Sequence, residues 1–333
     1  MFTRPEALED VTILAALRDG WGFDAVAVDY LAAGFGSHHW VARAADGARR
    51  FVTVDDLASR EFLGQGPSAA FDGLSKAFGV ARALRDSGLN WVVGPLPGPD
   101  GSVLRWLDAT YSIAVFPYVE GTATEEYVSE DERSAVVALL AKLHQSSGPV
   151  EAVARREAFQ LPNRADLEAA LRSVDERWTG GPYSEPARAL LGEHVRGVRR
   201  ILADYDHLAH EALRDPTGWT ITHGEPHSAN VLRTKEGFRI IDWDTALFAP
   251  RERDLWMLFP LTGADSLAQQ YSDATGHVVD KDSLHLYALW WDLCEIGIYL
   301  SEFRSTHRDT EDVRVAWRSL QHFIDADRRW PTG

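Results

Sequence analysis

The feature that most constrains the fold is the uneven distribution of strand and helix patterns along the 333 residues. Strand-like segments gather in the first third of the chain, whereas apolar residues recur at intervals of three and four over most of the remainder. No internal repeat or low-complexity tract interrupts this pattern. The segregation predicts an α+β fold instead of alternating βαβ units.

The first third predicts a small antiparallel sheet that carries one amphipathic helix. Asp46-Gly47 is a tight hairpin signal between two of its strands. Apolar residues at helical spacing over 69–87 predict a helix lying on the sheet, and Gly88 ends it. A helix is expected around 7–18, and strands are expected at 25–31, 39–44, 50–54, 91–93 and 111–116. We therefore place a sheet lobe at 1–116, a hinge at 117–121 and a helical lobe at 122–333.

The helical lobe begins with a capping box, in which Ser129 is followed three residues later by Glu132. The helix that it opens is expected to end near His144, which we interpret as structural. Cys294 is the single cysteine, so it has no internal disulfide partner, and its apolar surroundings predict a buried thiol. Further helices are expected at 163–178, 184–213, 255–267, 283–303 and 312–324.

The net charge of −16, from 50 acids against 34 bases, limits the partners of the chain. Such a field repels nucleic acid and anionic membranes and attracts cations, so a polycationic small molecule suits it. Solubility alone also explains the charge. The segment Met1–Glu6 carries no apolar run behind it, which predicts neither a secretory signal nor a membrane anchor and favours the cytoplasm. The oligomeric state stays open.

One segment between the helices, 219–244, reads as a hairpin with polar groups concentrated at its strand ends. Glu225 and Asn230 share one loop of this segment, and Asp242 follows the return strand. Two carboxylates and an amide oxygen that converge are hard oxygen ligands, suited to Mg²⁺ that carries phosphates. The sequence therefore predicts a metal and phosphate site here.

These motifs resemble those of the aminoglycoside phosphotransferases, a branch of the protein-kinase-like fold, and among them the spectinomycin phosphotransferases. The likeness rests on His223-Gly224-Glu225 with Asn230 five residues past the acid, on Ile241-Asp242-Trp243-Asp244, and on Glu252-Arg253-Asp254-Leu255. It implies a two-lobed fold and ATP as phosphoryl donor, with GTP open. It also implies that Glu225 accepts or orients the proton of the substrate hydroxyl, that Asn230 and Asp242 hold Mg²⁺, and that His223 and His227 support the loop.

The resemblance also implies where the nucleotide lies. Gly34, Phe35, Gly36 and Ser37 stand at the position of a loop that covers phosphates, where glycine backbone can approach them closely. Phe116 and Tyr118 border the expected hinge, whose backbone groups hold an adenine edge. Glycines that only turn a hairpin, and a simple linker between lobes, are the alternatives for the two segments.

Two residues depart from the pattern of that family. Glu225 stands where the family has Asp, so its carboxylate reaches one methylene further. Thr53 stands on the third strand where the family has a lysine that contacts phosphates. We favour Arg43 as the base that substitutes for it, ahead of Lys76, while both being plain surface charges is the alternative. The acid that would pair with such a lysine is expected at Asp72.

Candidates for binding the acceptor come mainly from the helix expected at 283–303. Acids and aromatic rings at helical spacing on one face suit an ammonium group through charge and cation–π attraction. The alternative is that the tryptophans are core residues and the acids are solvated. The candidates are Asp244, Glu185, Trp290, Trp291, Asp292 and Glu295.

Three hypotheses about function follow. The first is an ATP-dependent O-phosphotransferase that acts on a hydroxyl of a small, amino-bearing molecule such as spectinomycin or a related aminocyclitol, with antibiotic resistance as its role. The second, motivated by Thr53 and Glu225, is a catalytically impaired, nucleotide-binding relative. The third is a kinase-like enzyme of natural-product or peptide modification.

Overall fold

The computed structural model describes residues 4–325 except 6, 34–35, 147, 149 and 260–264. The chain divides into two compact units, one of Met1–Glu157 with Gly218–Val279 and one of Ala158–Thr217 with Asp280–Gly333. The expected sheet, the expected hinge and the 219–244 segment all belong to the first unit.

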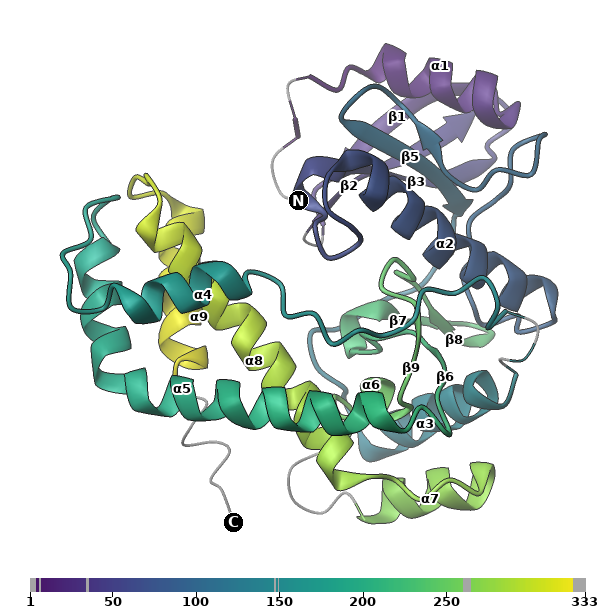
Figure 1. The fold of residues 1–333 in the computed structure, drawn as a ribbon. Helices are drawn as coiled ribbons and strands as arrows, with labels where there is room; N and C mark the ends of the chain where they lie inside the picture. The colour runs from purple at the N-terminus through teal and green to yellow at the C-terminus, as the bar shows by residue number, and fades with distance from the viewer. Residues whose placement is uncertain are drawn as a thin grey trace. The chain divides into compact units, whose positions relative to one another are not determined.

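The first unit contains a five-stranded antiparallel sheet (Figure 1). Its register pairs Thr53 with His39 on one neighbouring strand and with Ala114 on the other. In spatial order the strands are β1 (Ala25–Leu31), β2 (Ser37–Ala44), β3 (Arg49–Asp56), β5 (Tyr111–Pro117) and β4 (Arg105–Trp106).

The strand expected at 91–93 does not join this sheet, so that prediction was wrong. Its backbone instead pairs with Ile240, whose N–H donates to the Trp91 carbonyl and whose carbonyl accepts from Val93 N–H. The short strand β4 takes the edge beside β5, and the sequence pattern did not reveal it.

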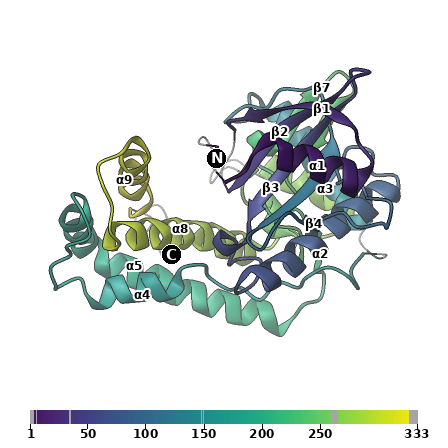
Figure 2. The ribbon, with the colours of Figure 1, turned by 90° about the horizontal axis from the view of Figure 1, so that it is seen from above.

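Two helices cover opposite faces of the sheet (Figure 2). Side chains alternate across a strand, so Trp40, Val52 and Val54 point to one face and pack with α1 (Asp10–Trp21). Ala114 and Phe116 point to the other face and pack with α2 (Pro67–Asp86). Thr53 and Asp55 of β3 alternate with Val52 and Val54, so their side chains point to this second face.

The remainder of the first unit holds helices and two short pairs of strands, of which β7 and β8 form a hairpin. The expected capping box is present, since Ser129 Oγ accepts a hydrogen bond from Glu132 N–H at 3.2 Å. Its elements are α3 (Glu130–Gln145), β6 (Thr220–Thr222), η2 (Ser228–Asn230), β7 (Val231–Thr234), β8 (Gly237–Ile240), β9 (Leu247–Ala249), α6 (Glu252–Leu255) and α7 (Asp265–Thr275). Strand β6 pairs with β9 and β7 with β8, both antiparallel.

The single helix expected over 255–267 is wrong in the described residues. Helix α6 ends at Leu255, turns follow at 256–259, and α7 begins at Asp265. Residues 260–264 lie outside the described part. The sequence there contains Pro260 and Gly263, which disfavour a continuous helix.

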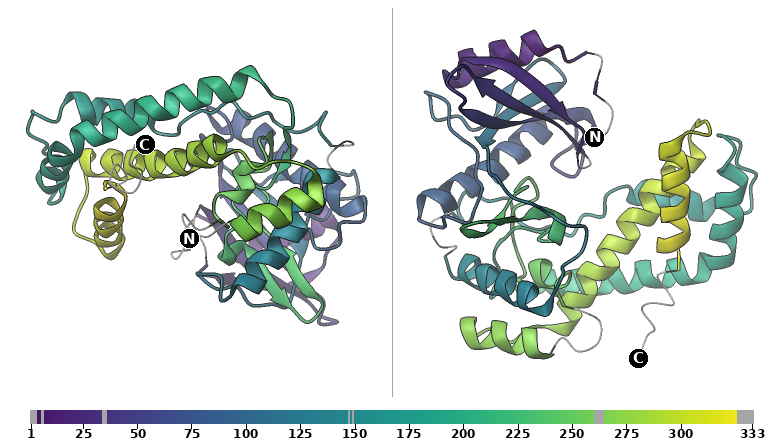
Figure 3. Two further views of the ribbon diagram at one scale, coloured as in Figure 1. Left: turned by 90° about the horizontal axis from the view of Figure 1, so that it is seen from below. Right: turned by 180° about the vertical axis from the view of Figure 1, so that it is seen from behind.

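The second unit consists of helices. They are α4 (Arg164–Arg172), α5 (Ser184–Arg214), α8 (Lys281–Arg304) and α9 (Glu311–Phe323). Helices α4, α5 and α9 all pack against α8, and α5 and α8 run side by side (Figure 3). Cys294 on α8 is buried and forms no disulfide, as expected. Although α5 has 31 residues and α8 has 24, no helix of the described chain is long and apolar enough to cross a membrane.

Candidate active site

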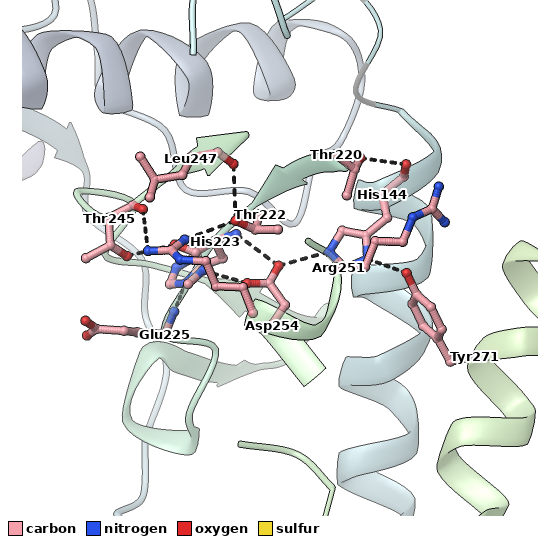
Figure 4. A network of polar contacts seen from close by, with 12 residues as sticks. His144, Thr220, Thr222, His223, Glu225, Thr245, Leu247, Arg251, Asp254 and Tyr271 are labelled. Carbon is pink, nitrogen blue, oxygen red and sulfur yellow. Dashed lines mark hydrogen bonds and ion pairs between the residues drawn. The ribbon is translucent and has the colours of Figure 1, made fainter. Parts of the chain in front are cut away.

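A buried carboxylate holds the loop that follows β6. Asp254, on α6, accepts hydrogen bonds from the backbone N–H groups of His223 and Gly224 at 2.9 and 2.6 Å, and from His144 Nε2 at 3.0 Å (Figure 4). Burial opposes its ionisation, but the hydrogen bonds and charge of His144 outweigh burial and hold the pKa of Asp254 below its ordinary value. His144, expected to be structural, therefore fixes this carboxylate from behind.

His223 ties the same loop to the segment that leaves β8. Its Nε2 lies 2.8 Å from the Ile241 carbonyl, which can only accept, and its Nδ1 lies 3.1 Å from Glu225 N–H, which can only donate. These two contacts require the neutral tautomer with the proton on Nε2. Burial lowers the pKa of His223 to about 4, so the ring stays neutral at physiological pH. A single imidazole thus sets the position of Glu225 relative to Ile241.

Gly224 is required by its backbone and by its neighbour. Its φ of 103° favours glycine, and a Cβ at this position would lie 2.4 Å from Cζ of Arg253. The Arg253 guanidinium donates to Thr222 Oγ1 at 3.0 Å and to the Thr245 carbonyl at 2.9 Å. The arginine therefore connects β6 to the segment after Asp244, directly beneath the loop.

The structure brings Glu225, Asn230 and Asp242 together. Asn230 Nδ2 donates to the Glu225 carbonyl at 3.0 Å, and the Asn230 carbonyl accepts from Ile241 N–H, also at 3.0 Å. His227 Nε2 lies 3.2 Å from the same Nδ2 and accepts from it, and burial lowers the pKa of His227. Because the amide nitrogen is engaged twice, the amide oxygen is the atom of Asn230 suited to a cation.

Asp242 and Asp244 form an acidic pair on one turn, with the Asp244 side chain buried and that of Asp242 exposed. Asp242 has a φ of 63°, a left-handed conformation that Asp tolerates better than most residues. Desolvation by the surrounding protein, and then the charge of Glu225, raise the pKa of Asp242 above its ordinary value. Burial, and then the charge of Asp242, raise the pKa of Asp244 above its ordinary value. Crowded, desolvated carboxylates of this kind favour a cation beside them.

Trp243 anchors the turn that carries this acidic pair. Its side chain is fully buried, its Nε1 donates to the Ile240 carbonyl at 3.0 Å, and its ring meets the His223 ring edge to face at 4.7 Å. The tryptophan fills the space beneath the turn, so the acids on either side of it are held in place by packing as well as by hydrogen bonds.

The donor set fits Mg²⁺ bound together with a phosphate-bearing ligand. Mg²⁺ prefers six oxygen ligands and in such sites takes only one or two from side chains, with phosphates and water supplying the rest. Asp242 and Asn230 offer a carboxylate and an amide oxygen from two adjacent backbone segments, which the hydrogen bond from Ile241 N–H to the Asn230 carbonyl joins. In the described part of the chain, no three His, Cys, Asp or Glu side chains form a complete metal cage.

The residues expected to cover the phosphates are partly described. Gly34 and Phe35 lie outside the described residues. Gly36 has a φ of 86°, and Ser37 opens β2 and donates from Oγ to Asp55 Oδ1 at 2.7 Å. The end of the expected loop is therefore tied to β3.

The two residues expected at the hinge point to different surroundings. Phe116 is buried and packs edge to face on Phe78 of α2 at 5.3 Å. Tyr118 lies beneath the guanidinium of Arg49, whose Cζ is 4.1 Å from the ring centroid. Residues 117–122 also line a groove of about 960 Å³ together with the β7–β8 hairpin.

Thr53 lies on β3 as expected, while the bases proposed to compensate for it lie elsewhere. The Thr53 side chain is 8% exposed, and its Oγ1 has no hydrogen-bond partner in the described structure. Arg43 pairs with Asp29 at 2.7 Å, and both side chains are more than half exposed. Lys76 and Asp72 are exposed on α2. The contacts of Arg43 thus do not support the role that we assigned to it.

Arg60, which sequence analysis missed, is the buried base of this site. It follows β3 and the short turn η1 (Leu57–Ser59), and its side chain is 7% exposed. Its Nη2 lies 2.5 Å from Asp55 Oδ1, and its Nη1 lies 3.1 Å from Asp244 Oδ2. No local spacing links these three residues, so only the folded chain reveals the arrangement.

Comparison with known proteins identifies the family of the chain. Residues 14–287 match the phosphotransferase enzyme family, APH. The chain belongs to this family. It is 32% identical over 268 residues to Protein StrN of Streptomyces griseus. The aligned region covers 76% of this chain and 77% of StrN. The chain is therefore a phosphotransferase, with the α+β fold that the resemblance implied.

Solved structures share the fold at low sequence identity. The spectinomycin phosphotransferase APH(9)-Ia, in complex with ADP and spectinomycin, matches with a TM-score of 0.74 and 15% identity over 98% of this chain and all of that one. The amicoumacin kinase hAmiN, in complex with AMP-PNP, Ca²⁺ and Ami, matches with a TM-score of 0.62 and 12% identity, over 97% and 95% of the two chains.

The remaining candidates for binding the acceptor lie in the second unit of the phosphotransferase. Asp292 is buried on α8, and Trp290, Trp291 and Glu295 are half-buried on the same helix. Trp290 Nε1 donates to the Gln160 carbonyl at 3.2 Å, and burial raises the pKa of Glu295.

Glu185 belongs to the first turn of α5, within the helix expected at 184–213. Its carboxylate accepts from Trp178 N–H at 2.7 Å and from Arg188 Nε at 3.1 Å. These contacts hold the pKa of Glu185 below its ordinary value, the Trp178 hydrogen bond first. They assign this carboxylate a local structural role.

We expect Asp254→Asn to destabilise the protein by about 2–4 kcal/mol, because the amide cannot accept from both backbone N–H groups and His144 at once. The free energy of unfolding is measured by urea denaturation, with tryptophan fluorescence as the signal. Asp86→Asn is the matched control, since Asp86 makes only an exposed pair with Arg82, and it should change stability by less than about 0.5 kcal/mol. Equal effects of the two substitutions would contradict the role of Asp254.

His223 predicts a loss of stability in mild acid. Its pKa is about 4 when folded and near 6.5 when unfolded, so the unfolded chain binds more protons between these values. Its contribution is complete above pH 6.5 and declines toward pH 4, by about 2 kcal/mol between pH 7 and 5. His39, whose pKa burial also lowers to about 4, adds to the decline.

Urea unfolding at pH 7 and pH 5 tests this expectation. In His223→Asn the difference in unfolding free energy between the two pH values should shrink by roughly the His223 contribution. An unchanged difference would show that His223 does not titrate as its burial implies.

Proposed function

We propose that this chain transfers the γ-phosphoryl group of ATP to a hydroxyl of a small, amino-bearing molecule. The observation that carries the proposal is the convergence of Glu225, Asn230 and Asp242 on two loops that His223 and Asp254 lock together. Phosphoryl transfer asks a protein mainly for positioning and for neutralisation of charge, and a rigid cluster of this kind supplies both. Membership of the phosphotransferase family supports the reaction class.

In this proposal each residue has one task. Glu225 takes the proton of the acceptor hydroxyl while the oxygen of that hydroxyl bonds to the γ-phosphorus. The terminal anhydride bond of ATP breaks in the same step, and ADP leaves. Asn230 and Asp242 hold Mg²⁺, which when bound neutralises phosphate charge. Asp254, His223 and Trp243 position the two loops. The longer side chain of Glu225, compared with Asp, shifts the hydroxyl outward by about one methylene.

An amino-bearing acceptor fits the charge of the chain and its acidic, aromatic helix. The net charge is −16, and α8 carries Asp292 and Glu295 beside two tryptophans. The raised pKa of Glu295 means that a neighbouring ammonium group would stabilise its charged form. An aminocyclitol such as spectinomycin is the substrate class that we favour, and APH(9)-Ia, with which the chain shares its fold, was solved with that compound. We propose resistance to such an antibiotic as the role.

A nucleotide-binding protein without transfer activity is the second candidate. Thr53 favours it, because a buried hydroxyl without a partner replaces a charged lysine on β3. Such a protein would bind nucleotide yet neutralise its phosphates poorly.

Two substitutions separate binding from chemistry. Asp242→Ala should abolish Mg²⁺-dependent ATP binding, because it removes the carboxylate that holds the metal. Glu225→Ala should leave that binding nearly intact and stop transfer, because it removes only the proton acceptor. Calorimetry measures binding, and release of ADP with a panel of aminocyclitols, aminoglycosides, choline and hydroxyamino acids measures transfer.

The wild-type chain in the same assays decides between the two candidates. Turnover with one member of the panel supports the transferase, whereas tight ATP binding without turnover on any of them supports the binding protein. Undiminished ATP binding by Asp242→Ala would contradict the metal site.

A further inference from the structure

Arg60 links three segments that the proposed function places around the nucleotide phosphates. Its Nη1 contacts Asp244, two residues after the proposed metal ligand Asp242, at 3.1 Å. Its Nη2 contacts both Asp55 on β3 and Ser37 at the start of β2. The base therefore joins the end of the phosphate-covering loop, the strand that lacks a lysine, and the metal turn.

The Arg60 guanidinium still has donors to offer. A guanidinium carries five N–H groups, and the three contacts above use hydrogens of Nη1 and Nη2 only. Its Nε is buried and has no partner in the described structure, and the same holds for Asp55 Oδ2. A buried, unpaired N–H of a charged group costs free energy unless an acceptor completes it. An anionic oxygen is the acceptor that suits it best.

Gly36 adapts the loop to this arginine. A Cβ on Gly36 would lie 2.9 Å from Arg60 Nη1, and the φ of 86° at Gly36 disfavours any other residue. The backbone of the phosphate-covering segment thus lies directly against the guanidinium. Any phosphate held by this backbone would lie close to the positive charge of Arg60.

We propose that Arg60 is the phosphate-binding base of this phosphotransferase, replacing the strand lysine of its family, with Asp55 as the acid that orients it. The inference rests on the proposed function, because it needs a nucleotide in the site. It replaces both of our sequence-based assignments, since Arg43 and Asp72 lie on the surface while Arg60 and Asp55 form a buried pair. In this pair the acid, Asp55, comes from β3, and the base, Arg60, comes from the turn that follows β3. From the sequence, the acid was expected on the helix that packs on the sheet.

Phosphate dependence of binding tests this proposal. Calorimetry with adenosine, AMP, ADP and ATP in the presence of Mg²⁺ measures how much affinity each phosphate adds. Arg60→Met should weaken ATP binding by about 10-fold or more, because it removes a charge-assisted contact. Adenosine carries no phosphate, so its affinity should stay within about 2-fold of wild type by the same argument.

Arg43→Met is the matched control, because it removes an arginine of β2 that pairs with Asp29 on the surface, and it should leave the whole series unchanged. Arg60→Lys and Arg60→Gln separate charge from folding. The glutamine variant should lose the gain in affinity from adenosine to ATP, and the lysine variant should keep most of it. Thermal unfolding of each variant reports its stability independently.

Three outcomes would overturn the proposal. Equal weakening of adenosine and ATP by Arg60→Met would mean that Arg60 only supports the fold. Tighter ATP binding would mean that Arg60 competes with phosphates for Asp244. Equal loss in the lysine and glutamine variants would mean that its charge is irrelevant. If the wild-type chain binds neither adenosine nor ATP, the proposed function itself fails, a result distinct from all three.

Discussion

The carboxylate of Asp254 is the interaction on which the site depends. It lies wholly inside the first unit and accepts two consecutive backbone N–H groups, which belong to the residues just before Glu225. A charged acceptor in a low-dielectric interior makes these hydrogen bonds strong, and His144 keeps the charge in place from the other side. The loop that presents Glu225 is therefore held through its backbone N–H groups. The position of the loop does not depend on contacts made by the Glu225 side chain.

A second constraint is the concentration of negative charge beside that loop. Asp242, Asp244 and Asp55 surround Arg60, and burial together with mutual repulsion raises the pKa values of Asp242 and Asp244. Carboxylates that are desolvated and close together are costly in the absence of cations. The arrangement makes sense for a site that gains a divalent metal and a polyphosphate together, since each neutralises charge that the other would leave exposed. The packing of Trp243 keeps the acids from moving apart.

The strands and the loop cluster could be predicted because short-range patterns determine them. Alternation of apolar residues located β1, β2, β3 and β5, and polar residues at the ends of a hairpin pointed to Glu225, Asn230 and Asp242. Errors arose where a partner far along the chain decided the outcome. Residues 91–93 read as a strand of the sheet but pair with Ile240. The break after α6 was missed because apolar spacing outweighed Pro260 in the prediction.

Side-chain periodicity predicted the fold class, and the resemblance of short motifs to a known family predicted the family and the loop proposed to carry the chemistry. The folded chain alone decided which base serves the site. Arg60 lies 184 residues from Asp244 in sequence and contacts it at 3.1 Å. Nothing in the local sequence distinguishes a buried arginine from the exposed Arg43, because the difference is made by acids and backbone that only the tertiary structure brings around it.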